Sequence, residues 1–111
     1  MTKNVVPYDE AMADLYRENP DLAIATLNEA IKEGDSETFM TILGHIVKST
    51  SSVATLARQT SLNENTLHRT LSSHGNPTLK TLLNIFESLN LQLTVTRANH
   101  DSRKGIEAVV I

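Results

Sequence analysis

The chain of 111 residues has the length of one domain, and its 40% apolar and 21% charged residues exclude a disordered or fibrous protein. It contains no cysteine, which excludes disulfides, thiolate nucleophiles and Cys-containing metal sites, and no apolar run approaches the roughly 20 residues that span a bilayer. The net charge of −3 is unevenly divided, because residues 1–37 hold three basic and nine acidic side chains whereas residues 38–111 hold seven basic and four acidic ones. This asymmetry indicates two surfaces with different partners.

Two helical segments are predicted in the first third of the chain. The pattern of Tyr8–Glu18 is that of a short helix, which stops before Pro20 because a proline disfavours helical geometry in the residue before it. Asn19 is expected to cap a second helix, which ends at Gly34. The acidic side chains here are either the solvated faces of these two helices or a surface for a basic partner.

Helical patterns continue through the middle of the chain. Asp35 is expected to cap a third helix with a strong apolar stripe. Two short helical patterns follow, at residues 53–60 and 63–73, with very few residues between them. After a Gly-Asn-Pro break, Thr78 is expected to cap a Leu-rich helix.

The period of the pattern changes near the end. Apolar and polar residues alternate from Leu91 to Thr96, which predicts a half-buried strand. Residues Ile106–Ile111 are either a second short strand or a disordered tail. We therefore expect a mostly α protein with one or two short C-terminal strands.

Residues 52–71 have the pattern of a helix-turn-helix. Ser52 and Asn63 are good N-caps, and each opens a short helix. Leu62 is expected to fill the turn, and Ala57 is small at the point where the two helices cross. In this motif the first helix lies across the phosphate backbone of DNA and the second enters the major groove.

Polar side chains on the outer face of the second helix suit the edges of bases. Arg69 can donate two hydrogen bonds to guanine, Asn65 can pair with adenine, and Glu64 can accept from the amino group of cytosine. The predicted base-reading residues are Asn63, Glu64, Asn65, Thr66, His68 and Arg69. The predicted phosphate contacts are Lys48, Ser52, Arg58, Ser72, His74 and Lys80. Residues 45–80 hold four basic side chains and one acidic one, so the acidic total does not oppose DNA binding.

The spacing of the apolar residues also carries a resemblance to known proteins. The relevant residues are Leu56-Ala57, Leu62, Leu67 and Leu71, then Gly75-Asn76-Pro77-Thr78-Leu79 with Leu82-Leu83, then Leu89-Asn90-Leu91-Gln92-Leu93-Thr94-Val95. From about Asp35 to Val95 the chain resembles phage Cro and repressor proteins, and it is closer still to the addiction-module antidote (HigA-like antitoxin) family. Members of that family also begin with an acidic helical leader, similar to residues 8–34.

The chain departs from that family in three places. Ser61 stands where a glycine is usual at the turn, and a positive φ there would strain a serine by about 1 kcal/mol. Glu64-Asn65 and His68-Arg69 replace an early basic residue and a later aromatic–lysine pair, so the operator of the relatives cannot be carried over. The charged tail from Ala98 onward lies outside the resemblance.

The resemblance implies a five-helix, Cro/repressor-like helix-turn-helix bundle, with an N-terminal helical extension and the short C-terminal strands. The expected organisation is an acidic helical extension at residues 1–34, a DNA-binding domain with a terminal strand at 35–96, and a charged tail at 97–111.

The function that the resemblance implies is that of an antitoxin and transcriptional repressor in a type II toxin–antitoxin module. Such a protein binds its own double-stranded operator and neutralises a small basic toxin of the RelE type. DNA readers of this shape normally act as homodimers, whose contact would come from Leu91–Thr96 or from the N-terminal helices. Two alternatives are a prophage-type regulator without a toxin and a protein-interaction module that does not bind DNA.

Neither catalysis nor a cofactor is expected. The chain has no Gly-rich phosphate loop, nucleophile elbow or paired acid motif. The spacings of His45, His68, His74 and His100 match no metal-ligand pattern, and His45 is expected to face solvent. Since the N-terminus lacks the pattern of a signal peptide, we expect a cytoplasmic protein without a membrane partner.

Overall fold

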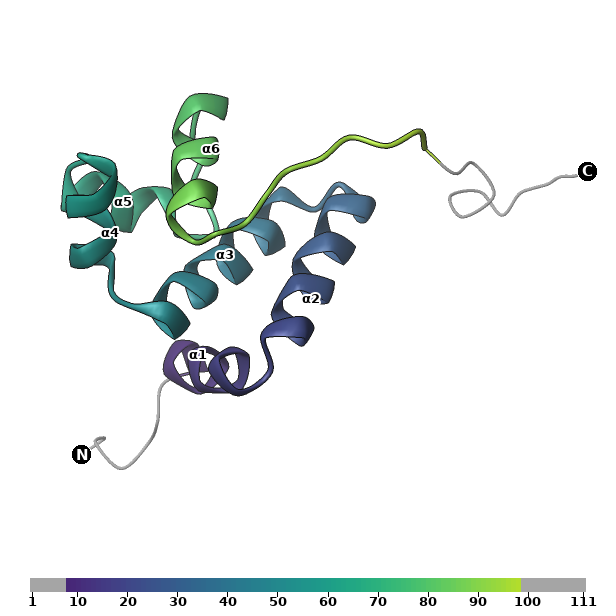
Figure 1. Ribbon diagram of the computed structural model, residues 1–111, viewed down its shortest axis with the longest axis horizontal. Helices are drawn as coiled ribbons and strands as arrows, with labels where there is room; N and C mark the ends of the chain where they lie inside the picture. The colour runs from purple at the N-terminus through teal and green to yellow at the C-terminus, as the bar shows by residue number, and fades with distance from the viewer. Residues whose placement is uncertain (1–7, 99–111) are drawn as a thin grey trace, which may run out of the picture.

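The computed structural model describes residues 8–98, which form six α-helices (Figure 1). The helices are α1 (Tyr8–Glu18), α2 (Pro20–Glu33), α3 (Ser36–Thr50), α4 (Val53–Thr60), α5 (Glu64–Thr70) and α6 (Leu79–Ser88). Helices α1 and α2 pack against α3, and α4 contacts α3, α5 and α6. Helix α3 therefore lies between the acidic helical pair α1–α2 and the pair α4–α5 (Figure 1). Within the described range no helix is long and apolar enough to cross a membrane.

Four of the five predicted N-caps are confirmed. The side chains of Asp35, Ser52, Asn63 and Thr78 each accept a hydrogen bond, at 3.1 Å, from the backbone N–H three residues later. Asn19 differs, because its side-chain amide donates to the Leu15 carbonyl oxygen at the end of α1 and makes no cap bond to α2. The start of α2 is fixed instead by Pro20 at the first helical position.

A single apolar core joins the helices. Its most deeply buried side chains come from α3, α4, α5 and α6, and they are Leu43, Val47, Leu56, Leu67 and Ile85. On α3, Gly44 lies so close to the end of α5 that an added Cβ would stand 2.8 Å from the Leu71 carbonyl oxygen. This close approach of two backbones sets how near the end of α5 lies to α3.

The prediction of five helices with C-terminal strands is wrong, although the mostly helical character is confirmed. Residues 8–98 form six helices and no strand. After α6 the chain runs past the junction of α2 and α3 without helical structure (Figure 1). A segment of alternating apolar and polar residues forms a strand only where a second strand pairs with it, and the described part of the chain contains no second strand. Leu91 and Leu93 instead line a groove with apolar side chains of α2, α3 and α6. The second predicted strand, Ile106–Ile111, lies outside the described residues.

Candidate nucleic-acid interface

Helices α4 and α5 are joined by a tight turn whose geometry follows from its residues. Leu56 of α4 and Leu67 of α5 are both buried in the core, and Ala57 is buried where the two helices meet. Ser61 ends α4 in the left-handed conformation, with φ 60° and ψ 31°. The positive φ that strains a serine is therefore present at this position. The Asn84 side chain of α6 donates to the Thr60 carbonyl oxygen at 3.3 Å and fixes the end of α4.

The outer face of α5 presents the predicted base-reading residues to solvent. These six residues are all exposed, and they are Asn63, Glu64, Asn65, Thr66, His68 and Arg69. Leu67, on the opposite side of the same helix, has no exposed area. The orientation of α5 is therefore fixed by its apolar side.

The base-reading candidates differ in how many of their hydrogen-bonding groups already bind other residues of the protein. The Asn63 carboxamide oxygen accepts from the Thr66 N–H, so it is committed to the cap of α5. His68 Nε2 lies 3.6 Å from Glu64 Oε2, one turn away. Within residues 8–98 the side chains of Asn65, Thr66 and Arg69 make no hydrogen bond or ion pair. Asn65 and Arg69, four residues apart, are the two of these that can form paired hydrogen bonds with a base edge.

The predicted phosphate contacts are also exposed, but two of the serine hydroxyls are already used locally. All six residues, Lys48, Ser52, Arg58, Ser72, His74 and Lys80, are exposed. The Ser52 hydroxyl donates to Thr55 Oγ1 at 3.1 Å, and the Ser72 hydroxyl donates to the Arg69 carbonyl oxygen at 2.7 Å. Because a phosphate accepts hydrogen bonds and attracts cations, the lysines and Arg58 are better suited to it than these hydroxyls.

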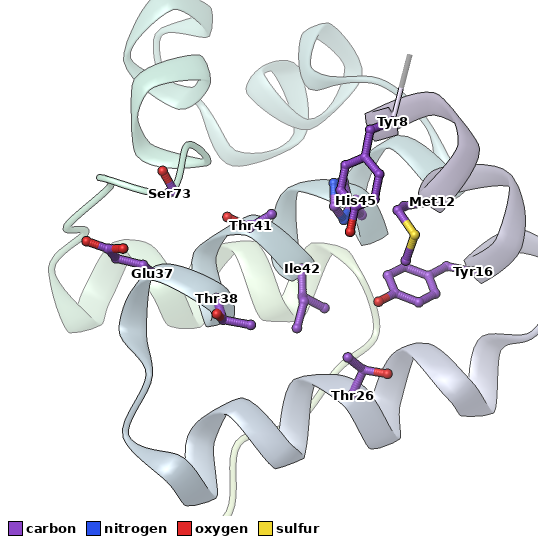
Figure 2. A pocket seen from close by; sticks show the side chains of 10 residues that line it. All are labelled: Tyr8, Met12, Tyr16, Thr26, Glu37, Thr38, Thr41, Ile42, His45 and Ser73. Carbon is purple, nitrogen blue, oxygen red and sulfur yellow. The ribbon is translucent and has the colours of Figure 1, made fainter. Parts of the chain in front are cut away.

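His45 does not face solvent, and that prediction is wrong. Its exposed fraction is 3%, and its ring packs near the rings of Tyr8 and Tyr16, which α1 brings to it (Figure 2). A carboxylate can only accept, so His45 Nε2 donates the 2.9 Å hydrogen bond to Asp9 Oδ1. This partner lies 36 residues away in the sequence, which explains why helical periodicity gave no sign of it.

The same contact fixes the ionisation of Asp9. The hydrogen bond from His45 is the main cause that lowers the pKa of Asp9; partial burial opposes it, and the nearby Lys48 ammonium adds a smaller lowering effect. Arg17 adds a second connection between α1 and α3, because its guanidinium donates to the Lys48 and Ser49 carbonyl oxygens at 3.2 and 3.0 Å. Helix α1 is thereby held on the last turn of α3, directly before the pair α4–α5.

A cavity of about 390 Å³ lies between α1, α2 and α3 and is lined in part by Tyr8, Tyr16 and His45 (Figure 2). No group of three or more histidine, aspartate or glutamate side chains within residues 8–98 could hold a metal ion. His100, the fourth histidine of the sequence, lies outside the described residues. The exposed outer face of α5 is thus the better candidate for a functional surface.

Residues 7–97 match the family described as "Probable addiction module antidote protein". The chain belongs to this family. An uncharacterised protein of Haemophilus influenzae (strain ATCC 51907 / DSM 11121 / KW20 / Rd) is 32% identical over 72 residues, which make up 65% of this chain and 73% of that protein. No solved structure matches the chain. Membership of this family indicates an antitoxin role, which is typically regulatory, and implies in general a toxin as the partner.

Proposed function

We propose that this antitoxin is a HigA-like repressor that binds its own operator through a Cro-type helix-turn-helix and neutralises a small basic toxin of the RelE type. The observation that carries the proposal is the outer face of α5. It holds six exposed polar side chains, and Asn65 and Arg69 keep their hydrogen-bonding groups available while Leu67 fixes the helix in the core.

The charge around α5 supports DNA as the ligand. Lys48, Arg58, Arg69 and Lys80 are all exposed, and Glu64 is the acidic side chain between residues 45 and 80. Such a surface attracts the phosphate backbone whatever the sequence, and base contacts from α5 then select the operator. A homodimer would place two copies of α5 in successive major grooves, about 34 Å apart.

The acidic pair α1–α2 is the surface proposed for the toxin. This surface holds acidic side chains that are exposed and that, unlike Asp9, make no hydrogen bond to α3. They are Glu10, Glu18, Asp21, Glu29 and Glu33. A basic partner would be steered to this surface by its charge.

DNA binding is tested by fluorescence anisotropy with a duplex from upstream of the protein's own reading frame and a scrambled duplex of equal length. We expect tighter binding to the first duplex and a steep loss of affinity with salt. Arg69→Ala should lower specific affinity by about 5- to 150-fold, which corresponds to about 1–3 kcal/mol, without changing thermal unfolding. Lys32→Ala is the matched control, because Lys32 is an exposed cation on α2. Salt-insensitive binding, or no binding to any duplex, would contradict the proposal and favour a protein-interaction module.

The toxin is tested separately from DNA. A short reading frame for a basic protein should lie beside that of the antitoxin, and its product should co-purify with the wild-type chain. Reversing the charge of Glu29 and Glu33 to lysine should weaken this complex while DNA binding persists. An isolated gene would favour the regulator without a toxin.

A further inference from the structure

The acidic N-terminal helix reaches the edge of the proposed DNA-binding surface. A hollow of about 350 Å³ lies where α1, α3 and the end of α5 meet, and Asp9, Lys48, His68 and Ser72 are among the residues that line it. Three of these four are candidate DNA contacts. The fourth, Asp9, brings a carboxylate into the same hollow.

The carboxylate of Asp9 is held in place from two sides. Its Oδ1 accepts the 2.9 Å hydrogen bond from the buried His45, and its Oδ2 lies 3.9 Å from Lys48 Nζ. The side chains of Asp9 and Lys48 are 56% and 44% exposed, so both charges remain accessible at the surface. Since the pKa of Asp9 is lowered, the carboxylate is ionised at neutral pH.

We propose that Asp9 weakens DNA binding by pairing with Lys48 and neutralising its charge. This inference rests on the proposed operator binding. Helix α1 thereby sets the affinity of a surface built from α3, α4 and α5. An operator phosphate that approaches Lys48 meets a cation already paired with Asp9, and His45 keeps the carboxylate from swinging away.

A purely structural role for Asp9, as the anchor of His45, makes a different prediction. Asn in place of Asp keeps an oxygen that can accept from His45 Nε2 and removes only the charge. A variant Asp9→Asn therefore separates the two roles. If the anchor alone matters, this variant leaves DNA affinity unchanged.

The test measures the affinity of the full chain for the upstream duplex over a range of salt concentrations. For Asp9→Asn we expect affinity to rise about 3- to 10-fold at low salt, because Lys48 then releases its own counterion on binding. The slope of log affinity against log salt should steepen by about 1. Glu10→Gln is the matched control, since it makes the same change of charge on the neighbouring exposed residue of α1, outside the hollow.

Lys48 tests the same contact from the other side. Lys48→Gln should lower affinity less than Arg58→Gln does, because Asp9 already offsets the charge of Lys48. In the double variant Asp9→Asn, Lys48→Gln, the gain from Asp9→Asn should shrink to that of Glu10→Gln.

The outcomes separate this inference from the proposed function. If the wild type binds and Arg69→Ala weakens binding, but Asp9→Asn and Glu10→Gln behave alike, only the role of Asp9 is overturned. If neither the wild type nor Asp9→Asn binds any duplex, operator binding and the inference fall together. A gain that persists when Lys48 is replaced would also overturn the proposed pairing.

Discussion

The two helical pairs on either side of α3 are held in place in different ways. The pair α4–α5 depends on local backbone geometry, through the caps of Ser52 and Asn63 and the left-handed turn at Ser61. The pair α1–α2 depends on contacts with α3 that are distant in the sequence: Asp9 and Arg17 of α1 make polar ones, and Leu27 of α2 is buried in the apolar core. The pair proposed to read DNA is therefore encoded in neighbouring residues, and the position of the acidic pair depends on long-range contacts.

Alanine in place of two glycines should separate these regions most strongly. A Cβ at Gly75, after α5, would collide with the Thr70 carbonyl oxygen, whereas Gly34, after α2, has open space and only its positive φ of 69°. We expect Gly75→Ala to destabilise the fold by about 3 kcal/mol or more and Gly34→Ala by about 1 kcal/mol. Urea unfolding of both variants checks this. Equal losses would show that the turn after α5 relaxes freely.

Asn63 distinguishes the local geometry of the α4–α5 pair from its surface chemistry. Since its side chain caps α5, Asn63→Ala should lower stability by about 1 kcal/mol, and Asn63→Ser should restore most of it. Thermal unfolding measures the cap, and DNA affinity is measured alongside. Full stability with lost affinity in Asn63→Ser would assign Asn63 to base reading.

Ser61 tests whether the α4–α5 turn carries strain. Its φ of 60° costs a serine energy that glycine does not pay, so Ser61→Gly should stabilise the protein by up to about 1 kcal/mol. The expected readout is a higher urea midpoint at an unchanged slope. Asn90, also at φ 60° but outside this turn, provides the comparison through Asn90→Gly, which should gain less because asparagine tolerates this conformation.

Acid should loosen the α1–α2 pair slightly before the rest. The hydrogen bond from His45 lowers the pKa of Asp9, the carboxylate that connects α1 to α3. A carboxylate with a lowered pKa stabilises the fold above its unfolded pKa, and this contribution is lost as pH falls through about 4 and below. Both tyrosines of the chain, Tyr8 and Tyr16, lie on α1, so their fluorescence reports on this pair. The midpoint of the acid transition measured by tyrosine fluorescence should lie at a higher pH than the midpoint measured by far-ultraviolet circular dichroism. The variant Asp9→Asn should bring the two midpoints closer together. Coincident transitions would show that α1 does not loosen separately.

Much of the candidate site could be predicted because its signals are local. The cap of α5, the inward Leu67 and the outward Asn65 and Arg69 all follow from spacing within one short segment. The burial of His45 cannot be predicted in this way, because the residues of α1 that contact its ring, Tyr8 and Tyr16, lie far away in the sequence. Residue types alone also cannot predict that the hydroxyls of Ser52 and Ser72 form local hydrogen bonds, because these bonds depend on the backbone geometry at each helix end.

Local patterns in the chain were enough to predict where the helices lie, which side of each is apolar, and how the charge divides between the two parts of the chain. These properties depend on neighbours within a few residues. Tertiary packing leaves Leu91–Thr96 without a strand to pair with among residues 8–98, and it brings Gly44 against Leu71. It also places an aspartate of the acidic helix beside Lys48. Each of these depends on which distant segments meet, and this is set by the packing of the whole core.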